Sequence, residues 1–62
     1  MADESYVVKV FEIVYAGHQR ADKLVHIVGE DRPMPRRTAE RVERGMTPNL
    51  NHERYYTKIA RV

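Results

Sequence analysis

Arginine is the residue type in this chain whose number and spacing could support chemistry. Four arginines lie close together in the middle of the sequence: Arg36, Arg37, Arg41 and Arg44. The planar guanidinium group matches the oxygen geometry of a phosphate, so such a row could grip a nucleic-acid backbone. Glu40 and Glu43 interrupt the row and neutralise part of its charge. The row also fits a solvated, ion-paired helix surface, which we favour, or a docking site for an acidic protein.

Histidine and serine show no pattern that indicates catalysis or metal binding. His18, His26 and His52 lack the close spacing of zinc ligands, and the chain has no cysteine. Ser5 is the one serine, and no glycine-rich phosphate loop is present. A chain this short also has little room for a concave pocket. We therefore predict no catalytic residue, no metal and no cofactor, and we do not expect an enzyme.

The arginine row must be positioned by a helix, which we predict over residues 35–45. At 100° per residue, Arg37, Arg41 and Arg44 fall on one side and should face water. Gly45 fits the positive-φ position that ends many helices, and the proline three residues later should prevent continuation. The opposite side carries a narrow apolar stripe that should lie on a sheet: Pro35, Ala39, Val42 and Met46.

The rest of the chain predicts strands and connections. Residues 5–15 are rich in β-branched and aromatic residues, and residues 23–29 and 54–61 alternate in a similar way. Residues 16–22 should form a loop, with Gly17 at a positive φ angle. The order strand, strand, helix, strand predicts a single α+β domain over residues 1–62. We expect a ββαβ arrangement, with the helix on one face of a three-stranded antiparallel sheet in the order 2-1-3.

One helix on a three-stranded sheet leaves one face of the sheet bare. We expect Val7, Phe11 and Ile13 to face the helix, although a bulge near Lys9 would change this alternation. In the second strand, the alternation puts Leu24, His26 and Val28 on one face. A bare apolar face is typical of a dimer surface or a partner site. Four residues are predicted to form the partner-binding surface: Val8, Val10, Val14 and Tyr56.

Composition supports dependence on a partner. A chain of 62 residues buries only about 60% of its unfolded surface, and no disulfide can compensate. Association into a homodimer is a common remedy. Residues 1–31 carry a net charge of −3 and residues 32–62 a net charge of +5, which could steer an acidic partner. The sequence has no apolar run that could span a bilayer and no signal peptide, so we expect no membrane partner and a cytoplasmic location.

The C-terminal half carries a distinctive pattern. It consists of Arg36-Arg37-Thr38-Ala39-Glu40-Arg41-Val42-Glu43-Arg44-Gly45-Met46, then Asn49-Leu50-Asn51-His52, then Tyr55-Tyr56-Thr57. This pattern resembles small bacteriophage-encoded proteins of unknown function in which it follows a strand hairpin. The resemblance implies a phage accessory protein acting in the host cytoplasm, and it brings no functional residue with it.

These observations favour a non-catalytic module that docks a protein partner or associates with itself through the bare sheet face. The alternative is nucleic-acid binding through Arg36, Arg37, Arg41 and Arg44. A third hypothesis, a structural subunit of a larger assembly, is not separated from the first by the sequence.

Overall fold

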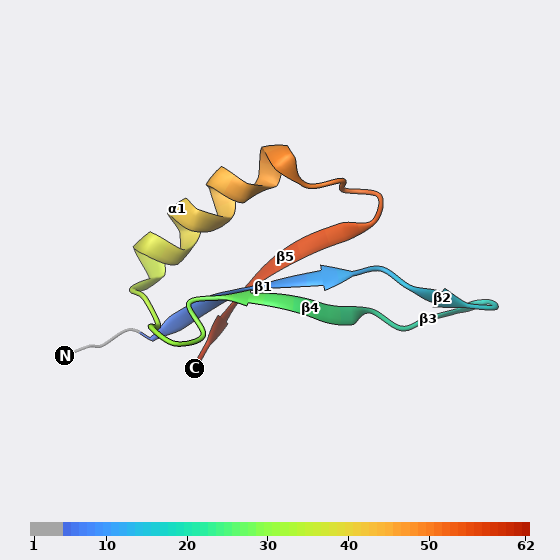
Figure 1. Cartoon of the computed structure of the whole chain (residues 1–62), viewed down its shortest axis with the longest axis horizontal. Helices are drawn as coiled ribbons and strands as arrows, with labels where there is room; N and C mark the ends of the chain where they lie inside the picture. Colours follow the sequence, from blue (N-terminus) through green and yellow to red (C-terminus); the bar gives the residue numbers. More distant parts are fainter. Residues whose placement is uncertain (1–4) are drawn as a thin grey trace.

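The computed structural model describes residues 5–62 and shows an antiparallel sheet with a helix across one face (Figure 1). In the main sheet the strand order is β4-β1-β5, and β1 is antiparallel to both neighbours. This arrangement confirms the predicted α+β fold, with the first strand in the middle. In chain order the elements are β1 (Tyr6–Glu12), β2 (Tyr15–Ala16), β3 (Gln19–Arg20), β4 (Lys23–Val28), α1 (Arg36–Met46), the 3-10 turn η1 (Thr47–Asn49) and β5 (Tyr55–Arg61).

Helix α1 turns its small apolar side chains toward the sheet, as the spacing predicts. Ala39 is fully buried, and Val42 and Met46 are half-buried. A methyl group at position 39 fits where the helix backbone comes close to the sheet, because a larger side chain would hold the two apart. The arginines of the opposite side are exposed to solvent: Arg37, Arg41 and Arg44.

The two ends of the helical segment differ from the prediction. Pro35 is an exposed, extended residue (φ −61°, ψ 155°) that precedes the helix. Gly45 lies inside the helix without a positive φ angle, and the chain continues into η1. Pro48 stands in the first turn of η1, where its missing N–H costs no hydrogen bond. The proline therefore does not stop the helical path, which ends at the extended residue Leu50 (φ −96°, ψ 143°).

The side chains of β1 alternate in the opposite sense to the prediction. The Thr57 hydroxyl donates a hydrogen bond to Glu43 Oε2 at 2.8 Å, so Thr57 faces the helix. Residues directly opposite each other in a sheet share a face, and Thr57 stands opposite Val10. Val10 and Val8 therefore face the helix, where they are 5% and 0% exposed. The prediction that they lie on the bare face was wrong. Both faces of β1 are apolar, so the sequence pattern does not show which face meets the helix.

Helix α1 lies over β1 and β5 and leaves β4 uncovered. A helix with its side chains is about 10–12 Å wide and strands are about 4.8 Å apart, so one helix covers roughly two strands. The packing of α1 on the sheet falls on β1 and β5. Within residues 5–62 the buried side chains are Val7, Val8, Val10 and Ala39. All four belong to β1 or α1, so β4 contributes no fully buried side chain.

Strand β4 carries one more residue than the stretch of β1 that it pairs with. Val10 lies opposite His26, whereas Phe11 lies opposite Leu24. Val25 consequently has no partner on β1, which is the arrangement of a β-bulge.

The bulge changes which side chains of β4 share a face. Leu24 moves to the bare face of the sheet with Ile27, because it stands opposite Phe11. His26 and Val28 remain on the helix face. The prediction of one face shared by Leu24, His26 and Val28 was wrong, since an extra residue shifts the alternation by one position.

Strands β2 and β3 form a narrow ribbon that projects beyond the main sheet (Figure 1). We call this ribbon the hairpin arm. Gly17 has a φ angle of 68° and is the first of the two residues that join the strands, as in a type II′ turn. This confirms the predicted conformation of Gly17, but the predicted loop over residues 16–22 was wrong where the arm is paired. The molecule measures 46 × 22 × 15 Å. Within residues 5–62 no helix has the length and apolar character needed to cross a bilayer.

Candidate functional site

Tyr56 is the centre of an aromatic and polar cluster on the bare face of the sheet. Its ring stacks on Phe11 with the centroids 5.3 Å apart and the planes inclined by 18°. The Arg20 guanidinium lies over the same ring at 5.8 Å from its centroid. The Tyr56 hydroxyl donates a hydrogen bond to Asp22 Oδ2 at 2.5 Å, and Arg20 donates two more to the Asp22 carboxylate at 2.8 and 3.0 Å. The cluster therefore ties the base of the hairpin arm to the sheet.

The groups of this cluster shift each other's pKa values. Hydrogen bonds from Arg20, and then from Tyr56, lower the pKa of the Asp22 carboxyl. The hydrogen bond to Asp22, together with desolvation, raises the pKa of the Tyr56 phenol. The pKa of the Arg20 guanidinium is also raised, mainly by its hydrogen bond to Asp22. The hydrogen bond from the phenol to Asp22 therefore links β5 to the base of the hairpin arm.

The four residues predicted to bind a protein partner do not form one surface. Val8 and Val10 are buried under the helix. Val14 lies beyond the end of β1, where its carbonyl accepts a hydrogen bond from the Ala21 N–H at 2.8 Å. Tyr56 does lie on the bare face, but its ring and hydroxyl are already engaged within the chain.

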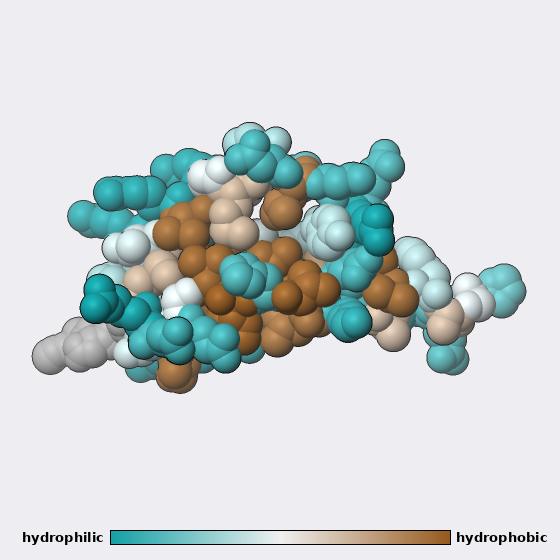
Figure 2. Space-filling view, in the orientation of Figure 1, coloured by the Kyte–Doolittle hydropathy of each residue, from teal (hydrophilic) through white to brown (hydrophobic). Residues whose placement is uncertain are grey.

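The exposed apolar surface lies instead along β4. Leu24 and Val25 expose 42% and 43% of their surfaces, and Ile27 and Val28 are half-buried. We call these four residues the β4 strip. In Figure 2 hydrophobic side chains gather along this strand and between it and the helix. Adjacent exposed apolar side chains of this size are typical of a docking surface.

The two edges of the main sheet differ in how they are protected. Strand β5 carries Lys58 and Arg61, and Arg54 just before it forms an ion pair with Glu12 at 3.0 Å. Charged side chains, especially lysine, discourage pairing with another strand. Strand β4 carries one charged residue, Lys23, at its start. The β4 edge is therefore the less protected of the two.

Sequence reasoning did not single out the β4 strip, although a signal was present. Residues 24–28 are apolar except for His26. In a chain with one predicted helix for three strands, the helix width leaves one strand uncovered. An almost continuous apolar run on an outer strand could have identified it.

The arginine row lies on the outer surface of α1. Arg36 pairs with Glu40 at 3.3 Å and lies over the Tyr6 ring at 6.0 Å from its centroid. Three arginines are exposed and form no ion pair within residues 5–62: Arg37, Arg41 and Arg44. The outer helix surface is therefore an exposed basic row, with Arg36 committed to contacts within the chain.

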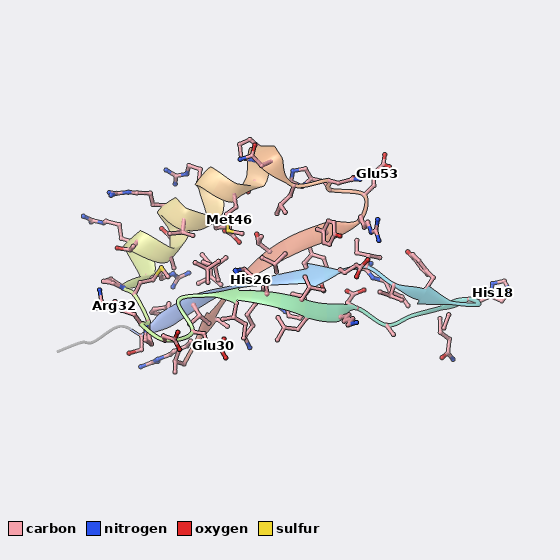
Figure 3. All side chains as sticks on the ribbon, in the orientation of Figure 1. His18, His26, Glu30, Arg32, Met46 and Glu53 are labelled. Atoms are coloured by element: carbon pink, nitrogen blue, oxygen red, sulfur yellow. The ribbon has the colours of Figure 1, made fainter. Side chains whose placement is uncertain are left out.

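The histidines lie in separate parts of the fold. Figure 3 shows His18 at the tip of the hairpin arm and His26 in the middle of β4. In the part of the chain that the structure describes, no three histidine, aspartate or glutamate side chains come together to hold a metal ion, and no pocket is found. Comparisons of the chain with protein-family models, with curated proteins and with solved structures give no match. The candidate sites are therefore the two surfaces that the fold presents, the β4 strip and the basic row.

Proposed function

We propose that this protein is a non-catalytic protein-binding module that docks a protein along β4. The observation that carries the proposal is that β4 is an apolar edge strand which the helix leaves uncovered. An edge strand offers unpaired backbone N–H and C=O groups to a further strand, and flanking side chains add apolar contact. The β4 strip supplies both elements in one place.

The proposal is tested by retention of proteins on the immobilised chain. Extracts of the cells that encode the chain are passed over the wild type, a Val25→Asp variant and a Lys58→Asp variant. Val25→Asp puts a charge into the β4 strip, whereas Lys58→Asp changes the other edge. We expect proteins that the wild type and Lys58→Asp retain and that Val25→Asp loses. Equal retention by all three proteins would contradict docking along β4.

A second candidate function, nucleic-acid binding, is supported by the basic row. Three exposed arginines without acidic partners present guanidinium groups that match phosphate oxygens: Arg37, Arg41 and Arg44. This candidate predicts an affinity for DNA or RNA that falls steeply with salt, because each phosphate contact releases counterions.

Gel retardation at low salt separates this candidate from the first. Replacing the three arginines by glutamate should abolish binding of single-stranded and duplex oligonucleotides. A control with Arg32→Glu, Lys58→Glu and Arg61→Glu has the same net charge and should keep binding. If the wild type retards no oligonucleotide, nucleic-acid binding is excluded as the function of this surface.

Two further hypotheses remain proposals. A structural subunit of a larger assembly would use the same strand, β4, for a permanent contact. The phage accessory role comes from the resemblance of residues 36–57 alone.

A further inference from the structure

We infer that the occupant of β4 is a second copy of this chain, paired antiparallel through β4 in a symmetric dimer. This inference rests on the proposed function, since it names the partner that docks along β4. The two sheets then join into one sheet of six strands in the order β5-β1-β4-β4-β1-β5. An antiparallel pair of identical strands in one sheet is related by a twofold axis perpendicular to that sheet, so both helices lie on the same side.

The backbone of β4 offers hydrogen-bonding groups to its outer edge at Ile27. Tyr6 exchanges N–H and C=O hydrogen bonds with Met34 at 2.8 and 3.0 Å, on the side of β1 that faces β4. In an antiparallel ladder the bonded residues alternate, so Val8 and Val10 also direct their backbone groups toward β4. Ile27 stands opposite Lys9, between these bonded pairs, and its own N–H and C=O point away from β1.

The outward groups of Ile27 define a register for the dimer. A twofold axis at Ile27 lets the two copies of this residue exchange a reciprocal pair of backbone hydrogen bonds. His26 of each copy then stands opposite Val28 of the other, and both residues lie on the helix face. The register therefore keeps the helix face and the bare face of the two sheets continuous across the joint, with the two copies of Ile27 side by side on the bare face.

The ends of β4 have opposite charges, which favours antiparallel pairing with itself. Lys23 begins the strand, and Glu30 and Asp31 follow its end (Figure 3 shows Glu30 in this loop). In this register Lys23 of one copy lies near the turn that carries Glu30 and Asp31 in the other, and symmetry repeats this contact. Neither Lys23 nor Glu30 forms an ion pair within residues 5–62.

The other edge does not have this self-complementarity. Strand β5 carries Lys58 near its centre and Arg61 at its end, with Arg54 just before it and no acidic residue between them. Pairing β5 with a second β5 would bring like charges together across the joint. Pairing β4 with β5 of another copy would leave an edge open at each end and produce filaments rather than a closed dimer.

The amount of exposed surface fits a dimer interface. The chain exposes 4909 Å², whereas a compact monomer of 7.3 kDa exposes about 4,200 Å². The excess is on the order of 700 Å², and a standard interface buries about 800 Å² on each partner. The radius of gyration, 12.9 Å, also exceeds the roughly 10.6 Å expected for a compact domain of 62 residues. The uncovered β4 and the projecting hairpin arm both contribute to this open shape.

Sedimentation and cysteine cross-linking of the purified full chain test this inference. The wild type should sediment at twice the mass of 7.3 kDa over a concentration range in which Val25→Asp is monomeric, with dimer affinity at least tenfold weaker in the variant. The chain has no cysteine, so Ile27→Cys introduces one thiol at the twofold axis. Two such residues lie about 5.5 Å apart between Cα atoms, which suits a disulfide. Mild oxidation should link Ile27→Cys into dimers and leave the control Lys58→Cys mostly unlinked.

A charge exchange provides a second test that leaves the apolar strip intact. Lys23→Glu and Glu30→Lys should each weaken the dimer by several fold, and the double variant should recover most of the wild-type affinity. Circular dichroism checks that each variant is folded.

The outcomes separate this inference from the proposed function. A strict monomer up to the solubility limit overturns the dimer, while the proposed function survives if Val25→Asp still loses a different protein from the extract. Open-ended polymers, or a dimer that Val25→Asp leaves unchanged and Ile27→Cys does not link, also overturn the β4 dimer. If, in addition, all three immobilised proteins retain the same set from the extract, the proposed function falls as well.

Discussion

Strands β1 and β4 are neighbours with similar apolar content and different surroundings. Val8 in β1 has no exposed surface, whereas Val25 in β4 is 43% exposed. The difference does not come from residue type, because both are valines of neighbouring strands in one sheet, with Val25 at the bulge of β4. It comes from position, because β1 is the middle strand under the helix, whereas β4 is an edge strand that the helix does not cover. Hydrophobic residues that one helix cannot reach are available to a partner.

The largest effect should come from making the same substitution, valine to alanine, in the covered strand β1 and in the uncovered strand β4. Val8→Ala removes two methyl groups from a closed site and should lower the free energy of unfolding by about 2 kcal/mol. Val25→Ala should lower it by less than about 0.5 kcal/mol, because the side chain is already half in water. Urea denaturation followed by circular dichroism, at a concentration that keeps the chain monomeric, measures both values.

The comparison fails if the two valine variants lose equal stability. That result would mean that β4 is covered in the isolated chain and that the strip is not available for docking. A loss of about 2 kcal/mol is also a large share of the stability of so small a chain, so the Val8→Ala protein should unfold at a visibly lower urea concentration.

A pair of glycines sharpens the comparison with a smaller effect. Gly29 follows β4 with a φ angle of 92°, and an added Cβ would meet Met34 Cε at 2.6 Å. Gly29→Ala should therefore cost about 1–2 kcal/mol of stability. Gly45 lies inside α1 with open space around it, so Gly45→Ala should gain about 0.5–1 kcal/mol. Thermal unfolding of both variants checks the opposite signs, and a loss for Gly45→Ala would contradict the open helix surface.

The smallest expected effect concerns pH and the hairpin arm. Because the pKa of Asp22 lies below its ordinary value of 3.8, its contribution to stability is complete above that value and is lost as pH falls through the lowered pKa. The raised pKa of Tyr56 acts at the other end: its contribution is complete below 10.0 and is lost as pH rises through the raised pKa. The loss at low pH is the acid limb of the stability profile, and the loss at high pH is the alkaline limb. NMR signals of the arm, followed from acid to alkaline pH, report both limbs.

Two variants isolate the acid limb. Asp22→Asn should remove it, whereas Asp31→Asn changes an exposed carboxylate outside the cluster and should keep the wild-type profile. An acid limb that persists in Asp22→Asn would show that the hydrogen bonds of Arg20 and Tyr56 to this carboxylate do not hold the arm to the sheet.

Much of the architecture could be predicted from the sequence. The β-branched run at the start, the helical spacing from Ala39 to Met46 and the turn at Gly17 are local patterns, and each produced its element. The α+β fold and the strand order follow from the order of elements and short connections. The helix was predicted to end at Gly45, because Pro48 was expected to stop it. Pro48 instead fits into the first turn of the 3-10 segment that follows the helix.

The candidate site was less predictable, because it depends on which face of each strand meets the helix and on the register between strands. Val8 and Val10 were expected on the bare face, yet a strand with two apolar faces does not reveal which one meets the helix. The bulge at Val25 places Leu24 on the bare face, and no residue type in β4 indicates that the strand contains an extra, unpaired residue. The exposed arginines were anticipated because helical periodicity alone separates Arg37, Arg41 and Arg44 from the apolar stripe.

The sequence by itself determined the helix and the three strands of the main sheet, but not the paired strands of the hairpin arm, and it determined which side of the helix is basic. Those properties depend on neighbours within a few residues along the chain, so they can be recognised without coordinates. Only the tertiary structure decided that β4 is the strand left uncovered, that Val8 is buried under the helix and that the bulge puts Leu24 on the bare face. Burial depends on where a helix of fixed width comes to rest on the sheet, and that position is set by contacts between residues far apart in sequence, such as Glu43 and Thr57.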